Sequence, residues 1–394
     1  MSLTPENAAW VSQTFERLTA NIGQALLGKA PVIRLALTCL LAEGHLLLED
    51  APGTGKTALA RAMAQTVQGT HARIQFTPDL LPSDITGSTQ FDQQSRQWEF
   101  HAGPVLNSIV LADEINRASP KTQSALLEVM EESQVTVDGE SYPTGRPFMV
   151  IATQNPIEQA GTYRLPEAQL DRFLMKTSVG YPDRQAALQI LAGSAEPDRT
   201  KRLSPAISAT AVAEMADEIS QLHIDESVLE YIQLLSEATR SDEATTLGVS
   251  TRGSIGMARA CRVWAAAHGR NYVNPDDVRE LALPVWSHRL ILTPDAEFSG
   301  VTANDVLGRA LAAVRPPLVR GQQGAPAQAG PPAPGQPGPS GPVGQPGQPG
   351  PSGQPGPANP SAQPGPPAQP IQPARPPQTP PTGPGSGPGP RPRG

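Results

Sequence analysis

The feature that most constrains the fold of this chain is a short glycine-rich loop between a predicted strand and a predicted helix. The apolar run 45–49 is typical of a strand buried on both faces, and residues 58–67 favour a helix. Between them stands the sequence Asp50-Ala51-Pro52-Gly53-Thr54-Gly55-Lys56-Thr57. Small residues let backbone N–H groups close around phosphate oxygens, and a helix start attracts anions. The order strand, loop, helix therefore predicts an α/β fold that binds a nucleotide.

Two residues of the loop have side chains suited to ATP and its metal ion. Lys56 is expected to contact the β- and γ-phosphates, and Thr57 to offer its hydroxyl to Mg²⁺. The general pattern has glycine five positions before Gly55, where this chain has Asp50. A chance glycine-rich turn is the alternative interpretation. The predicted nucleotide-binding residues are Asp50, Ala51, Pro52, Gly53, Thr54, Gly55, Lys56, Thr57 and Ala58.

A second apolar strand candidate, residues 108–112, ends in two acids, Asp113 and Glu114. A carboxylate at the end of a buried strand is costly unless it meets a cation such as hydrated Mg²⁺. Asp113 therefore suits the metal ion, and Glu114 suits a general base that polarises the attacking water. An Asp-Glu pair alone is weak evidence, but together with the glycine-rich loop it indicates ATP hydrolysis.

A third strand candidate, residues 148–153, is followed by Asn155 and Pro156. The Asn155 amide could hold the catalytic water or contact the γ-phosphate. Asn-Pro is also an ordinary turn signal, and taken alone this second interpretation is favoured.

The remaining pattern divides the folded part into two. Strands that alternate with helices predict a layered sandwich with a parallel sheet, and residues 133–142 carry Asp138-Gly139, a hairpin signal. Beyond Tyr181 the pattern is helical, which predicts a small separate domain. Its expected helices are 185–191, 209–222, 226–239, 254–268 and 275–283.

The C-terminal segment has a different composition. More than half of the 45 prolines lie beyond Arg315, and glycine stands at every third position from Gly335 to Gly356. A short collagen-like trimer is one interpretation of these triplets. We favour the other, a disordered solvated arm, because the segment lacks apolar side chains that could form a core.

The charge and the two cysteines limit the class of protein. The overall net charge is −7, and without the four arginines that follow Val319 the preceding residues carry −11. An acidic body argues against a general nucleic-acid-binding surface. Cys39 and Cys261 are expected to be buried free thiols. No signal-peptide pattern or membrane span is visible, so we expect a soluble cytoplasmic protein without membrane insertion.

With these motifs in place, the chain closely resembles the MoxR family of AAA+ ATPases, from about residue 22 to 292. Three segments carry the resemblance most specifically. They are Phe76-Thr77-Pro78-Asp79-Leu80-Leu81-Pro82-Ser83-Asp84-Ile85-Thr86-Gly87, Ala112-Asp113-Glu114-Ile115-Asn116-Arg117-Ala118 with the following run 120–128, and Pro166-Glu167-Ala168-Gln169-Leu170-Asp171-Arg172-Phe173.

The resemblance implies roles that spacing alone does not supply. Asn155 corresponds to the sensor-1 residue, Arg172 to the arginine finger that reaches the neighbouring subunit's γ-phosphate, and Arg252 to sensor 2 on the lid. Taken alone, Arg172 would more often be a surface ion-pair residue. Thr251 and Arg164 stand where proline is more usual, and His288-Arg289 resembles a lid signature better suited to packing than to chemistry.

The resemblance also implies a fold and a function. The expected fold is an AAA+ P-loop three-layer sandwich with a small all-α lid domain and a disordered tail. The expected ranges are 1–27 for an N-terminal helix, 28–182 for the nucleotide-binding domain, 183–315 for the lid and 316–394 for the tail.

A homo-oligomeric ring, expected to be a hexamer, would use ATP and Mg²⁺ to remodel a client protein, often one with a von Willebrand-A-type domain. Two hairpins, 88–101 and 133–148, would face the pore or the client, unless they are simply exposed loops. The alternatives are a nucleic-acid-dependent motor and a nucleotide-dependent scaffold without turnover.

Overall fold

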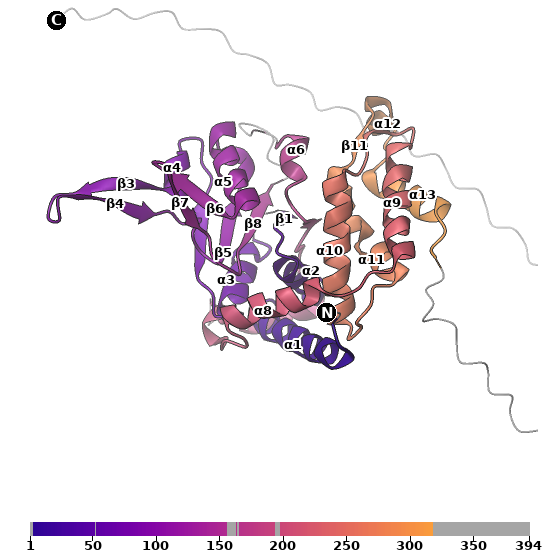
Figure 1. Cartoon of the computed structure of the whole chain (residues 1–394), viewed down its shortest axis with the longest axis horizontal. Coiled ribbons are helices and arrows are strands. Elements are labelled where there is room, and N and C mark those ends of the chain that lie inside the picture. Colours follow the sequence, from indigo (N-terminus) through magenta and orange to yellow (C-terminus); the bar gives the residue numbers. More distant parts are fainter. Residues whose placement is uncertain (1–2, 52, 156–162, 164, 194–197, 318–394) are drawn as a thin grey trace, which may run out of the picture. The chain divides into compact units, whose positions relative to one another are not determined.

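The computed structural model in Figure 1 describes residues 3–51, 53–155, 163, 165–193 and 198–317. Pro52 of the predicted loop, Arg164 and the proline-rich segment from residue 318 onward lie outside the described residues. The tail prediction is therefore not tested.

The centre of the fold is a five-stranded parallel sheet in the order β2-β5-β8-β1-β9. The strands β1, β5 and β8 match the three apolar runs of the sequence, as expected. The strands are β1 (Leu46–Glu49), β2 (His71–Gln75), β5 (Ile109–Asp113), β8 (Met149–Gln154) and β9 (Met175–Thr177).

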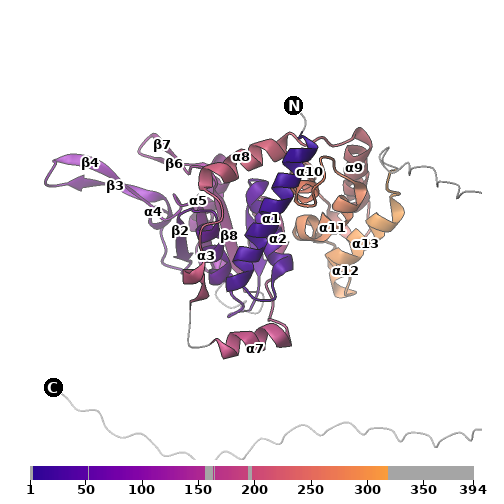
Figure 2. The ribbon, with the colours of Figure 1, turned by 90° about the horizontal axis from the view of Figure 1, so that it is seen from below.

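Side chains of the sheet alternate between two apolar cores. In β1, Leu46 and Leu48 face the core formed with α1 (Pro5–Ala25), α2 (Ala30–Leu41) and α3 (Lys56–Thr66), whereas Leu47 faces α5 (Pro120–Glu132). This alternation is the period of two expected of a strand covered on both faces. Helices α1 and α2 lie side by side (Figure 2). The three-layer sandwich is thus confirmed.

Two hairpins leave this sandwich. The first follows α4 (Pro82–Thr86) and consists of β3 (Gly87–Asp92) and β4 (Gln97–Ala102); it projects from the body in Figure 1. Its entry requires glycine, because Gly87 has φ +92° and an added Cβ would lie 2.2 Å from the His101 carbonyl oxygen. The second, β6 (Gln134–Val137) with β7 (Glu140–Pro143), turns at Asp138-Gly139 as expected.

The C-terminal region is the predicted helical lid, with one addition. A two-stranded antiparallel ribbon joins β10 (Thr245–Leu247) to β11 (Ile291–Leu292), strands too short to give a period in the sequence. The lid helices are α8 (Ala209–Ser220), α9 (Glu226–Arg240), α10 (Thr251–Ala267), α11 (Pro275–Trp286), α12 (Pro294–Phe298) and α13 (Ala303–Ala313).

Short elements complete the described residues. They are η1 (Ile115–Arg117), α6 (Glu167–Leu170), α7 (Arg184–Ala192), η2 (Arg199–Arg202) and η3 (Ser287–Arg289).

Cys39 and Cys261 are buried free thiols, as expected, and burial raises the pKa of both. Among the described helices, none combines the length and the apolar character needed to cross a membrane.

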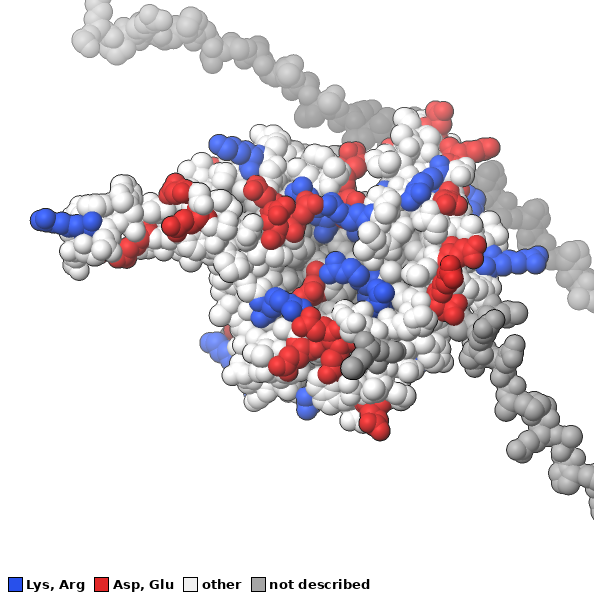
Figure 3. All heavy atoms as spheres, in the orientation of Figure 1, with Lys and Arg blue, Asp and Glu red and all other residues white. Residues whose placement is uncertain are grey.

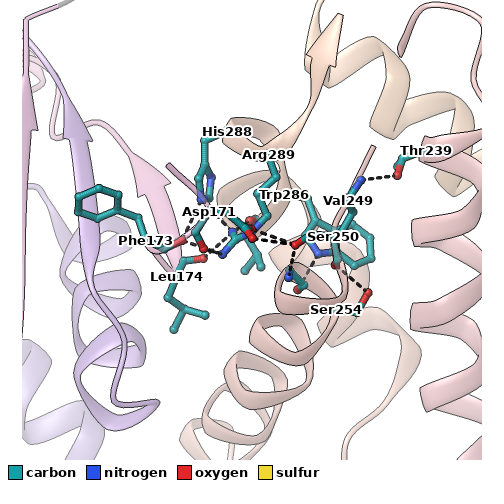
Figure 4. A network of polar contacts seen from close by, with 12 residues as sticks. Asp171, Phe173, Leu174, Thr239, Val249, Ser250, Ser254, Trp286, His288 and Arg289 are labelled. Carbon is teal, nitrogen blue, oxygen red and sulfur yellow. Dashed lines mark hydrogen bonds and ion pairs between the residues drawn. The ribbon is translucent and has the colours of Figure 1, made fainter. Parts of the chain in front are cut away.

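One buried arginine ties the lid to the sandwich. The Arg289 side chain is 3% exposed and its Nε donates to an Asp171 carboxylate oxygen at 2.8 Å. Its other nitrogens donate to the carbonyl oxygens of Phe173 at 2.7 Å and Leu174 at 3.2 Å, and the Ser250 hydroxyl donates to the second Asp171 oxygen at 2.9 Å (Figure 4). Burial lowers the pKa of Arg289, and the Asp171 charge opposes this shift.

We predict that Arg289→Ala destabilises the protein strongly. The change removes the guanidinium from the Asp171 carboxylate and from several carbonyl oxygens, and breaking a buried ion pair in this way costs about 3–5 kcal/mol. The matched control is Arg309→Ala on α13, because Arg309 pairs with Asp242 at 2.7 Å but is 49% exposed; about 0–1 kcal/mol is expected there. Urea unfolding followed by circular dichroism measures the free energy of unfolding of both variants. Equal losses of stability would contradict the role of Arg289 in joining the lid to the sandwich.

Candidate active site

The glycine-rich loop runs from β1 into α3 with two glycines in left-handed conformations. Gly53 has φ +82° and Gly55 has φ +101°, a region that residues with a Cβ rarely adopt. Gly55 is also the N-cap of α3, and no side chain among the described residues caps that helix. The first N–H groups of α3 are therefore open to an anion, which is what a phosphate site requires.

Asp50, the departure from the expected glycine, is used by the fold. Its side chain is buried, and its two carboxylate oxygens accept hydrogen bonds from the backbone N–H groups of Val179 at 2.5 Å and Gly180 at 2.9 Å. Asp50 therefore anchors the loop to the stretch after β9. The Lys56 ammonium donates to the carbonyl oxygens of Asp50 and Ala51, at 3.2 and 3.1 Å.

A cavity of about 520 Å³ lies beside this loop. Its walls combine an apolar part with the loop backbone, which fits a nucleotide whose base is apolar on its faces and whose phosphates are charged. The lining includes Ala25, Leu26, Gly53, Thr54, Gly55, Ala58, Ile190 and Leu191. A larger cavity of about 750 Å³ lies between α2, α11 and α13 and is lined by none of the predicted site residues.

The two predicted catalytic acids lie at the carboxyl edge of the same sheet, where β1 also ends. Asp113 is the last residue of β5, and its Oδ1 accepts a hydrogen bond from the Thr153 hydroxyl on β8 at 2.6 Å. The same hydroxyl accepts from the Glu114 backbone N–H at 2.9 Å. Glu114 has φ +57°, a left-handed conformation that is uncommon outside glycine and is found at functional sites.

Residues of β2 hold both carboxylates. Arg73 donates to Asp113 Oδ2 at 2.6 Å, and Gln75 donates to Glu114 Oε2 at 2.9 Å. Arg117 also donates to Glu114 Oε2, at 2.9 Å. These partners were not predicted from the sequence. The signal that could have found them is the alternation in residues 71–75, which places Arg73 and Gln75 on one face of a strand.

The residues expected at Mg²⁺ suit that ion. The Asp113 carboxylate is paired with Arg73 at 2.6 Å, so a bound ion would compete with that guanidinium for its oxygens. Carboxylate and hydroxyl oxygens, here of Asp113 and of Thr57 in the first turn of α3, are ligands that Mg²⁺ prefers. Asn155 follows β8 directly at the same edge.

The remaining two predicted residues, Arg172 and Arg252, lie together at the C-terminal end of α5. Arg172 pairs with Glu131 at 2.8 Å, and Arg252 pairs with the other oxygen of the same carboxylate. They line a cavity of about 400 Å³ that shares no described lining residue with the cavity beside the glycine-rich loop. The structure thus groups the predicted site residues into two separate sets.

Comparisons with known proteins agree with this architecture. Residues 45–175 match the model of the ATPase family associated with various cellular activities (AAA), and residues 237–310 match the AAA lid domain. A solved structure from Cytophaga hutchinsonii, assigned as an ATPase, superposes with a TM-score of 0.75 at 36% identity, over 79% of this chain and 98% of that one.

Three named relatives match this chain over most of their own length. Chaperone MoxR1 of Mycobacterium tuberculosis is 38% identical over 81% of this chain and 87% of its own, and protein MoxR of Paracoccus denitrificans is 33% identical over 72% and 90%. The protein YeaC of Bacillus subtilis is 45% identical over 76% and 94%. With the loop, the acids and the lid in place, the chain belongs to the MoxR family of AAA+ ATPases.

Proposed function

We propose that this chain assembles into a homo-oligomeric ring, a hexamer, which hydrolyses ATP to ADP and phosphate and uses the energy to remodel a client protein. The observation that carries the proposal is the division of the site residues. Gly53, Thr54 and Gly55 line the cavity beside the loop, whereas Arg172 and Arg252 line another cavity that shares no described residue with it. The two sets complete one site only if a neighbouring subunit supplies the arginines.

The residues of the first set divide the chemistry between them. Lys56 neutralises the β- and γ-phosphates, and bound Mg²⁺, held by Thr57 and Asp113, would neutralise charge that develops on the phosphate oxygens. Glu114 accepts the proton of the attacking water. Gln75 and Arg117, at 2.9 Å each, orient the Glu114 carboxylate. Asn155 at the end of β8 holds the water or the γ-phosphate.

The second set acts across the ring. An arginine that contacts the γ-phosphate of an adjacent subunit stabilises the transition state, and in related phosphoryl transfers such a residue contributes about 10³–10⁵ in rate. Arg172 and Arg252 come from the sandwich and from the lid respectively, and both meet the same Glu131 carboxylate. We propose that they reach the neighbouring site as a pair.

The hairpin β3–β4 is the proposed contact for the client. Phe91 and Trp98 form an edge-to-face pair at 5.4 Å, and Trp98 is 71% exposed. Exposed aromatic pairs of this kind mark protein-binding surfaces. A relative named Chaperone MoxR1 supports a chaperone-like role. That the client has a von Willebrand-A-type domain rests on family resemblance.

The surface does not favour the nucleic-acid motor. On the face shown in Figure 3, acidic and basic side chains of the described residues alternate and form no broad basic patch. The overall net charge of −7 points the same way. A scaffold without turnover is the other alternative, and a turnover assay decides it.

We predict that Lys56→Ala loses tight nucleotide binding, because the charge that meets the β- and γ-phosphates is removed. Glu114→Gln should keep nucleotide binding and lose most turnover, since an amide cannot accept the proton. Fluorescent-nucleotide titration and phosphate release measure the two effects. Wild-type turnover by Glu114→Gln would refute the general-base role.

We predict that Arg172→Ala binds nucleotide normally but loses turnover by about 10³-fold or more. Mixing it with Lys56→Ala subunits should restore activity, because about a quarter of the head-to-tail interfaces in a random mixture join an intact loop to an intact arginine. Phosphate release from mixed rings measures this. No recovery in rings shown to contain both variants would mean that Arg172 does not act on the neighbour.

We predict that Glu114→Gln with Mg-ATP retains its client, because blocked hydrolysis removes the release step while ATP and client favour the same state. Capture from a native lysate, compared with Lys56→Ala, should enrich a protein with a von Willebrand-A-type domain. Adding Trp98→Ala to the Glu114→Gln variant should abolish the capture of this protein. Enrichment of nuclease-sensitive nucleic acid instead would favour the motor.

A further inference from the structure

The last turn of α5 carries a carboxylate that joins the two domains. Glu131 Oε2 lies 2.8 Å from an Arg172 guanidinium nitrogen, and Oε1 contacts Arg252 from the lid. All three side chains are partly exposed and line the cavity of about 400 Å³. One anion thus offers a separate oxygen to each of two arginines.

A terminal phosphate offers the same arrangement with more charge. Its oxygens can each accept from a different guanidinium, and arginine pairs bind phosphate in this way. The other two acids that line this cavity are already engaged, because Asp171 accepts from Arg289 and Ser250, and Glu43 accepts from Arg146. Glu131 is therefore the carboxylate that an arriving phosphate would have to replace.

We propose that Glu131 is an intramolecular substitute for the γ-phosphate of the neighbouring subunit. In a subunit without an ATP-loaded neighbour, Glu131 occupies Arg172 and Arg252. A γ-phosphate presented across the interface displaces it, whereas ADP lacks the group that competes. This inference rests on the proposed function, because it assigns a regulator to the same two arginines.

Displacement of Glu131 from the two arginines would affect the structure nearby. Glu131 stands two residues before Ser133, the left-handed C-cap of α5, and β6 begins at the next residue. Release of Glu131 therefore frees the helix end at the base of the hairpin β6–β7. The γ-phosphate of one subunit would in this way change the restraint on a hairpin of the next.

The first test measures anion binding without assembly or turnover. Glu131→Gln is compared with Glu132→Gln, since both remove one carboxylate from the same helix end but Glu132 has no ion pair among the described residues. Lys56→Ala is present in both proteins to weaken phosphate binding at the loop. With inorganic phosphate as the probe, calorimetry should show about 3–10-fold tighter binding for Glu131→Gln, as expected from the loss of two partly exposed ion pairs. Equal or weaker binding would overturn the proposal.

The second test uses the chain with Lys56 intact. Glu131→Gln should lower the ATP concentration for half-maximal turnover about 3–10-fold, and Glu132→Gln should leave it unchanged. A loss of turnover by Glu131→Gln at an unchanged half-saturating concentration would overturn the inference and make Glu131 a positioning residue. If Arg172→Ala instead kept full turnover, the proposed action of Arg172 on the neighbouring site would fail, whatever the phosphate titration showed.

Discussion

The parallel pairing of β1, β8 and β5 is the constraint on which the rest of the molecule depends. Because the three strands run in the same direction, their carboxyl ends bring the glycine-rich loop, Asn155 and the acids to one edge. Thr153 couples two of these ends, since its hydroxyl donates to Asp113 and accepts from the Glu114 N–H. The two buried faces hold the strands rigid, so the polar groups at the edge need little reorganisation.

The sequence was sufficient for the parts of the site that are local. The loop, the acids and the apolar strands are each contiguous, and their physical requirements can be recognised within about ten residues. The strand β2 was missed because its exposed positions carry Arg73 and Gln75 instead of apolar residues. The use of Asp50 as an anchor was also missed, because its partners, Val179 and Gly180, are distant in the sequence.

Contacts between the domains were the least predictable part. Arg252 and Glu131 are 121 positions apart, and no periodicity relates a helix end in the sandwich to the first turn of a lid helix. The buried Arg289 makes their meeting possible, because it fixes the Asp171 segment beside Ser250. The packing role expected for Arg289 from the family resemblance agrees with this. That Arg289 also helps to bring Arg172 and Arg252 together could not be predicted, because it depends on tertiary structure.

The ring stack between Phe100 and Tyr142, with centroids 3.9 Å apart, has a mechanical consequence for the two hairpins. Phe100 belongs to β4 and Tyr142 to β7, and both lie in the half of their hairpin nearer its root, so the two hairpins support each other close to the body. A tensile load applied at the tip of β3–β4 would be divided between two attachment points, at α4 and at α5. The outer part of β3–β4, with Phe91 and Trp98, extends beyond this support.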